Sequence, residues 1–162
     1  MSNLIITNPM IMECLIKEGI DKKSVNLADA KYVLPTEEAI KAFGKRYLDF
    51  LWSSGLDKWR SEIWDCDDFA FGSRSLASID NALWQNATGN TDCGLAFGIA
   101  WVMTMDGGHA INIAIYQDES GSLGVHYYEP QLQSSSENIG EPFVCLQKIS
   151  RDSFLFPLWY YL

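Results

Sequence analysis

The spacing of hydrophobic positions changes character partway along the chain. Three segments in the first half have the spacing of amphipathic helices. Residues 8–18 begin with Asn8 as N-cap and Pro9 in the first turn, and a second helix follows Thr36 and ends near residue 54. The third helix lies within residues 64–86, whereas residues 21–34 show no regular period.

Beyond residue 94 the chain is rich in β-branched and aromatic residues. Runs at 95–105, 109–117 and 123–131 are separated by turn residues at 106–108 and 118–121, and residues 142–150 and 154–162 are further candidate strands. Helices therefore precede strands, an order typical of an α+β fold. We expect one domain over residues 1–162, with N-terminal helices packed on a C-terminal antiparallel sheet.

Composition narrows the classes of partner. The formal net charge is −9, and no cluster of Lys and Arg is visible. Binding to nucleic acid or to an anionic membrane needs such clusters, so we expect neither partner. An acidic chain is compatible with divalent cations, which prefer carboxylate oxygens.

The four cysteines, at 14, 66, 93 and 145, have no metal-binding spacing. The N-terminus has neither a basic start nor a cleavage site, and no apolar run approaches the length of a membrane span. We therefore expect reduced thiols and a cytoplasmic location. The apolar tail, residues 154–162, is interpreted either as a core strand or as part of a homodimer surface.

Cys66 lies in the sequence WDCDDFA, where the third helix should begin. A helix N-terminus lowers the pKa of a thiol, which favours the nucleophilic thiolate. Asp65, Asp67 and Asp68 oppose that effect, and a bound cation would relieve it.

His109 and Glu129 lie on the runs 109–117 and 123–131. If these runs pair as a hairpin, the two side chains share a face and can form a hydrogen bond. The carboxylate would then orient the imidazole, as the acid of a catalytic triad does. Strand alternation turns His126 to the other face, which indicates a structural role.

The motifs WDCDDFA, GHAIN and YEPQ together resemble the cysteine-protease-like C-terminal domain of the fairy-ring mushroom agglutinin and its bacterial and phage relatives, over roughly residues 36–131. The resemblance implies a papain-like cysteine-protease fold, dependence on calcium, and a triad of Cys66, His109 and Glu129. It also implies that Asp67 and Asp68 bind calcium, with Asn112 and Gln131 as further candidate ligands.

Two departures from the family limit what the resemblance implies. The founding member also has a sugar-binding β-trefoil, for which this chain has no room, so lectin activity is not carried over. Papain-like enzymes often place a Gln shortly before the nucleophile to bind the oxyanion, and residues 58–63 contain none.

The leading functional hypothesis is a calcium-dependent cysteine hydrolase, most simply a peptidase acting on a peptide or protein substrate. One alternative is a non-catalytic phage or bacterial binding protein that retains the papain-like fold. The other is a peptidoglycan amidase or a transglutaminase-like enzyme, which share the order of the catalytic groups.

Overall fold

The computed structural model describes residues 4–58, 60, 63–89, 92–131 and 147–162. Its helices are α1 (Asn8–Lys17), α2 (Glu37–Ser54) and α3 (Cys66–Thr88), with short 3-10 helices at Lys22–Ser24 and Arg151–Ser153. Its strands are β1 (Ile5–Thr7), β2 (Val25–Asn26), β3 (Lys31–Val33), β4 (Gly94–Leu95), β5 (Phe97–Thr104), β6 (Gly107–Gln117), β7 (Leu123–Glu129), β8 (Gln147–Ile149) and β9 (Phe156–Tyr161).

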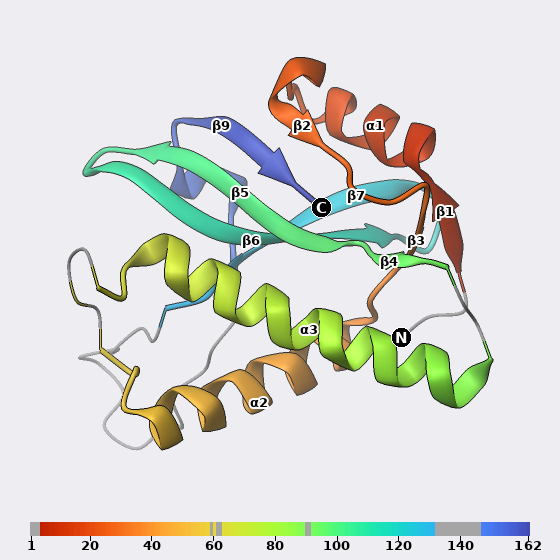
Figure 1. Ribbon diagram of the computed structural model, residues 1–162. Helices are drawn as coiled ribbons and strands as arrows, with labels where there is room; N and C mark the ends of the chain where they lie inside the picture. The colour runs from red at the N-terminus through yellow and green to blue at the C-terminus, as the bar shows by residue number, and fades with distance from the viewer. Residues whose placement is uncertain (1–3, 59, 61–62, 90–91, 132–146) are drawn as a thin grey trace.

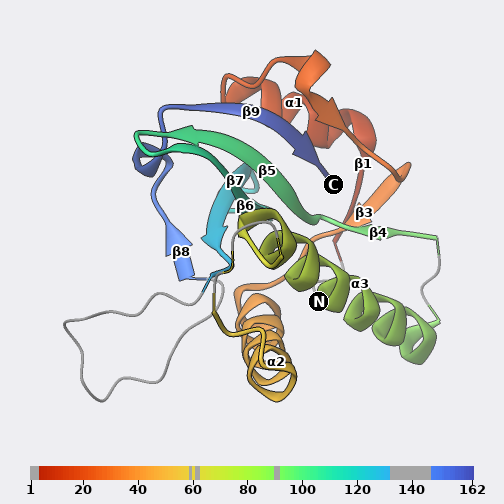
Figure 2. The ribbon, with the colours of Figure 1, turned by 60° about the vertical axis from the view of Figure 1, so that its left-hand side comes forward.

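The strands form two sheets. The larger sheet has the order β2-β9-β5-β6-β7-β8, and the smaller has the order β1-β3-β4. Figures 1 and 2 show α1 on one side of the larger sheet and α3 on the other, with α2 beyond it. The central hairpin of β6 and β7 therefore lies between two helical layers.

Local sequence explains where the two long helices begin and end. The Thr36 hydroxyl accepts a hydrogen bond from the Ala39 N–H at 3.2 Å and caps α2. At the start of α3, the Asp68 carboxylate accepts a hydrogen bond from the Asp65 N–H at 3.2 Å. Gly55 and Gly89 end the two helices with positive φ, a conformation that glycine adopts at little cost.

Alternation along β6 divides the core into two. Ile111, Ile113 and Ile115 are fully buried in the cluster that includes Ile11 and Leu15 of α1. The residues between them point to the opposite face, against α2 and α3. Each face of β6 is therefore covered by a different helical layer, and neighbouring residues on this strand belong to different sites.

The predicted arrangement of helices on a purely antiparallel C-terminal sheet is wrong. β2 runs parallel to β9, and β3 runs parallel to β4, so both sheets are mixed. The strands β2 and β3 come from residues 21–34, for which the sequence indicated no regular structure. Strands of two or three residues are too short to show a period, and their partners lie far away along the chain.

The C-terminal tail is a core strand, as one of the two interpretations expected. β9 pairs with β2 on one side and with β5 on the other. Tyr160 and Leu162 are fully buried. Of the predicted strand 142–150, the part from Gln147 to Ile149 forms β8, and residues 142–146 lie outside the described residues.

Cys14, Cys66 and Cys93 are free thiols, and the predicted free thiol at 145 lies outside the described residues. Within the described part of the chain, no helix has the length and apolar character needed to cross a bilayer.

Candidate functional site

The predicted contact between His109 and Glu129 is present. The His109 Nε2 lies 2.7 Å from the Glu129 Oε2, and the other carboxylate oxygen accepts a hydrogen bond from the Gln131 N–H at 3.0 Å. The register pairs Asn112 with Tyr128, so Glu129 lies diagonally across from His109 and not directly opposite. Glu129 is only 6% exposed, and these two contacts satisfy its buried carboxylate.

A pocket of about 510 Å³ surrounds this pair. It lies on the face of β6 that also carries Ile111, and its lining includes Val102, His109, Glu129 and Phe154. The pocket therefore combines a carboxylate–imidazole pair with apolar walls.

Cys66 lies at the first residue of α3, as the sequence predicted. Its side chain packs with Ala110, Ile99 and Trp101, and its sulfur interacts with the backbone of Ala110. Burial, followed by the negative charges of Asp65 and Asp67, raises the pKa of the Cys66 thiol. The thiol is therefore protonated at neutral pH, in contrast to the thiolate that a nucleophile requires.

The structure does not join Cys66 to the histidine. Ala110, against which Cys66 packs, is adjacent to His109 on β6, so the side chains of these two β6 residues point to opposite faces. Among the described residues, no hydrogen bond connects Cys66 with His109. A cysteine nucleophile and its base are expected within hydrogen-bond reach, and the three predicted catalytic residues do not form such a chain.

Acidic side chains gather around the thiol. Ligand atoms of Asp65, Cys66 and Asp67 all lie within 4.8 Å of one another. A hydrogen bond between the two carboxyl groups, together with partial burial and the charge of Asp65, raises the pKa of Asp67. This cluster is a candidate cation site, although it places a soft sulfur between the oxygens that calcium prefers.

The calcium ligands predicted from the sequence do not form one site. Asn112 is completely buried. Its Oδ1 accepts a hydrogen bond from Ser73 at 2.5 Å, and its Nδ2 donates to the carbonyls of Ala70 and Gly98 at 3.0 Å. Asn112 is therefore a structural tie between α3 and the sheet, and its assignment as a metal ligand is wrong.

The other predicted ligands have different roles in the structure. Asp68 caps α3 and does not belong to the cluster around Cys66. Gln131 holds Glu129 through its backbone N–H. Only Asp67 of the four lies in the acidic cluster, so calcium binding stays a prediction, and its ligands would be Asp65 and Asp67.

His126 points away from Glu129, as strand alternation predicted. Its ring stacks on Tyr116 with centroids 3.7 Å apart, and it contacts the Tyr128 hydroxyl and the Lys148 ammonium. These side chains lie at a second pocket, on the α2 face, which the sequence analysis did not identify. The signal was present: alternation places His126 and Tyr128 on one face, and Tyr116 lies on the neighbouring strand.

Comparison with known proteins supplies the family. The model of the family described as "Agglutinin C-terminal" matches residues 32–135. A structure titled "PSL1a-E64 complex" matches with a TM-score of 0.66 and 21% identity, covering 98% of this chain and 51% of that chain.

A second structure is that of Polyporus squamosus lectin, bound by its title to the human-type influenza-binding epitope Neu5Acα2-6Galβ1-4GlcNAc. It matches with a TM-score of 0.59 and 24% identity, covering 79% of this chain and 43% of that chain. The chain thus spans about half the length of these two proteins. No curated protein sequence matches the chain at a significant level.

These findings correct two predictions. An agglutinin family and lectin structures stand where a cysteine protease was expected, so the papain-like protease fold and the calcium-dependent cysteine hydrolase are overturned. The alternative of a non-catalytic binding protein fits the comparisons better, and the resemblance to the agglutinin domain is confirmed.

Proposed function

The chain belongs to the agglutinin C-terminal family, and from this premise we propose that it is a non-catalytic binding protein whose ligand is a glycan. The family match covers residues 32–135, which include Cys66, His109 and Glu129. A family of agglutinins is one in which binding is the expected activity, and its fold can present a site without performing chemistry there.

Support for a glycan ligand comes from the structural neighbours. The Polyporus squamosus lectin is bound to a sialylated trisaccharide, by its title. That binding belongs to a protein of which this chain covers 43%. Carrying glycan recognition over to this chain is therefore part of the proposal, and it replaces the peptide or protein substrate expected from the sequence.

The absence of catalysis is supported by one observation above all. Cys66 packs against Ala110 beside two carboxyl groups, whereas His109 lies with Glu129 in a pocket on the other face of β6. A triad needs the base beside the nucleophile, and the negative surroundings of Cys66 hold the thiol in its protonated form. The pair of His109 and Glu129 then stabilises the hairpin instead of activating a thiol.

The test is a glycan microarray probed with the labelled protein, followed by calorimetric titration of the strongest ligand. We expect saturable binding of at least one glycan, with the same Kd in Cys66→Ala as in the wild-type protein. Cys93→Ala is the matched control, because Cys93 is also a partly buried free thiol.

Two results would contradict the proposal. One is a complete lack of glycan binding by a folded wild-type protein. The other is cleavage of a peptide library by the wild-type protein but not by Cys66→Ala, which would restore the hydrolase hypothesis.

A further inference from the structure

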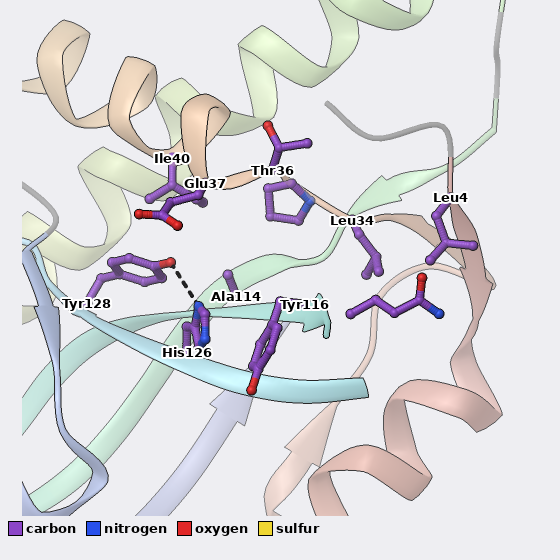
Figure 3. A pocket seen from close by; sticks show the side chains of 11 residues that line it. Leu4, Leu34, Thr36, Glu37, Ile40, Ala114, Tyr116, His126 and Tyr128 are labelled. Atoms are coloured by element: carbon purple, nitrogen blue, oxygen red, sulfur yellow. Dashed lines mark hydrogen bonds between the residues drawn. The ribbon is translucent and has the colours of Figure 1, made fainter. Parts of the chain in front are cut away.

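A pocket of about 350 Å³ lies between the start of α2 and the β6–β7 hairpin (Figure 3). Its volume is at the small end of the range for ligand sites, which suits one or two sugar rings. The lining is mixed in character and comprises Leu4, Leu34, Pro35, Thr36, Glu37, Ile40, Ala114, Tyr116, Gln117, His126 and Tyr128.

We propose that this pocket binds a neutral pyranose ring of a glycan, with the ring stacked on Tyr116 and its hydroxyl groups bonded to Glu37. The inference rests on the proposed glycan-binding function and deepens it by naming the site and the sugar class. The site lies on the face of the sheet opposite the His109–Glu129 pair.

The aromatic platform is held rigidly. Tyr116 pairs across the hairpin with Gly124, and its ring stacks on His126 with an interplanar angle of 24°. A Cβ added at Gly124 would lie 2.7 Å from the Tyr116 ring, so only glycine lets the ring lie this close to the strand. A ring fixed in this way offers a flat apolar surface at little cost in conformational entropy on binding.

Polar groups stand across the pocket from this platform. Figure 3 shows Glu37 and Thr36 at the start of α2, facing the strands that carry Tyr116, His126 and Tyr128. The Glu37 carboxylate is mostly exposed and lies 3.1 Å from Lys41. The Tyr128 hydroxyl lies 3.4 Å from the His126 Nδ1. Burial and the nearby charge of Glu37 raise the pKa of Tyr128 to about 12, so its hydroxyl remains a hydrogen-bond donor.

This combination matches the chemistry of a sugar. A pyranose has an apolar face of C–H groups that packs on an aromatic ring, and an edge of hydroxyl groups that donate to a carboxylate. Ala114, Ile40 and Leu34 form an apolar floor for the rest of the ring. The carboxylate of Glu37 and the net charge of −9 disfavour an acidic sugar in this pocket.

The experiment is a calorimetric titration of the wild-type protein with Galβ1-4GlcNAc and with its sialylated form Neu5Acα2-6Galβ1-4GlcNAc, the trisaccharide named for the Polyporus lectin. We expect the neutral disaccharide to bind at least as tightly as the sialylated form. Tyr116→Ala should weaken its binding about tenfold or more, in line with loss of a stacking contact. Glu37→Gln should weaken it several-fold.

Two further variants complete the design. Gly124→Ala should weaken binding by displacing the Tyr116 ring without removing any side chain that lines the pocket, and it keeps the test valid if Tyr116→Ala fails to fold. Tyr161→Ala is the matched control: Tyr161 is a partly buried tyrosine that stacks near Trp159 outside the pocket, and its loss should leave Kd unchanged.

The outcomes separate this inference from the proposed function. If the wild-type protein binds the disaccharide and Tyr116→Ala, Glu37→Gln and Gly124→Ala bind it equally well, the pocket is the wrong site and glycan binding stands. If the protein binds other glycans on the microarray but neither of these two, the inferred sugar class is wrong. If it binds no glycan at all, both are overturned.

Discussion

The two histidines of the chain lie on neighbouring strands but face opposite sides of one sheet, and their surroundings differ sharply. His109 faces the α1 side and bonds to the buried carboxylate of Glu129. His126 faces the α2 side, where it stacks on Tyr116 and lies 2.9 Å from the Lys148 ammonium. One histidine is tied to an acid, and the other lies against a tyrosine and a cation.

The comparison shows why residue type alone did not locate the functional surface. His109 and Glu129 form the kind of pair that a triad uses, yet the thiol packs on the opposite face of the strand. His126 has no acid beside it in this structure, but it borders a pocket with an aromatic platform and a carboxylate. The five predictions below begin with the largest expected effect and test whether the two faces differ as described.

Asn112 fixes the α3 side of the sheet, and its replacement should have the largest effect on stability. Asn112→Ala removes three hydrogen bonds and leaves the carbonyls of Ala70 and Gly98 buried without a donor. We expect the free energy of unfolding in urea to fall by about 3 kcal/mol. Asn81→Ala is the control, because the described bond of Asn81 is a single one to the Cys93 carbonyl, and its loss should cost less. Equal losses would show that the tie at Asn112 is not special.

Glu129→Ala tests the α1 side. It removes the partner of the His109 ring and of the Gln131 N–H in a region that is mostly buried. Urea unfolding should show a loss of about 2 kcal/mol. The exposed acid Glu119 is the matched control, and Glu119→Ala should change stability little. A Glu129→Ala protein as stable as wild type would mean that the carboxylate–imidazole pair does not stabilise the hairpin.

Titration of His126 separates the two histidines electrostatically. Burial, followed by the charge of Lys148, lowers the pKa of His126. The unfolded chain therefore binds this proton more readily, and stability should fall as the pH is lowered from about 6.5. Lys148→Ala should raise the pKa of His126, measured by NMR of its ring protons. Lys31→Ala, which removes an exposed charge from another sheet, is the control. An unchanged His126 titration in Lys148→Ala would remove the electrostatic part of the comparison.

The carboxyl cluster at Cys66 should have a smaller effect. The pKa of Asp67 is raised in the folded state, so its stabilising share is present at low pH and is lost as the pH rises through the folded pKa. Asp67→Asn should therefore raise Tm slightly at neutral pH, and the gain should disappear in acid. Asp152→Asn, at an exposed acid far along the chain, should not show this pattern.

Calcium provides the last comparison. If Asp65 and Asp67 hold the ion, millimolar calcium should raise the Tm of the wild-type protein, because a ligand of the folded state stabilises it. The rise should be smaller with magnesium and absent in Asp67→Asn. Calorimetry without saturable calcium binding would reject the cation site, and the binding proposals would stand unchanged.

Local signals in the sequence located much of the fold. Thr36 and Gly55 bound α2 as their capping chemistry predicted, and the β6–β7 hairpin has the facing of His109, His126 and Glu129 that alternation requires. The first helix begins at Asn8, with Thr7 and not Asn8 as the N-cap. Such features depend on a few neighbouring residues, so a single sequence can reveal them.

Features set by distant contacts escaped prediction. β2 and β3 exist because they pair with β9 and β4, whose sequence positions are remote. The position of Cys66 likewise depends on how α3 packs across β5 and β6, which no local motif specifies. The pocket at Tyr116 joins α2 to the hairpin, and the role of Gly124 becomes visible only when the strands are paired.

The most direct test of the central claim is the alkylation rate of each cysteine, mapped by mass spectrometry on the folded protein at neutral pH. A binding protein with a protonated, partly buried Cys66 should show a Cys66 rate no faster than that of Cys93, and His109→Ala should leave it unchanged. A Cys66 that reacts orders of magnitude faster than Cys93, and loses that reactivity in His109→Ala, would contradict the account and identify a working nucleophile.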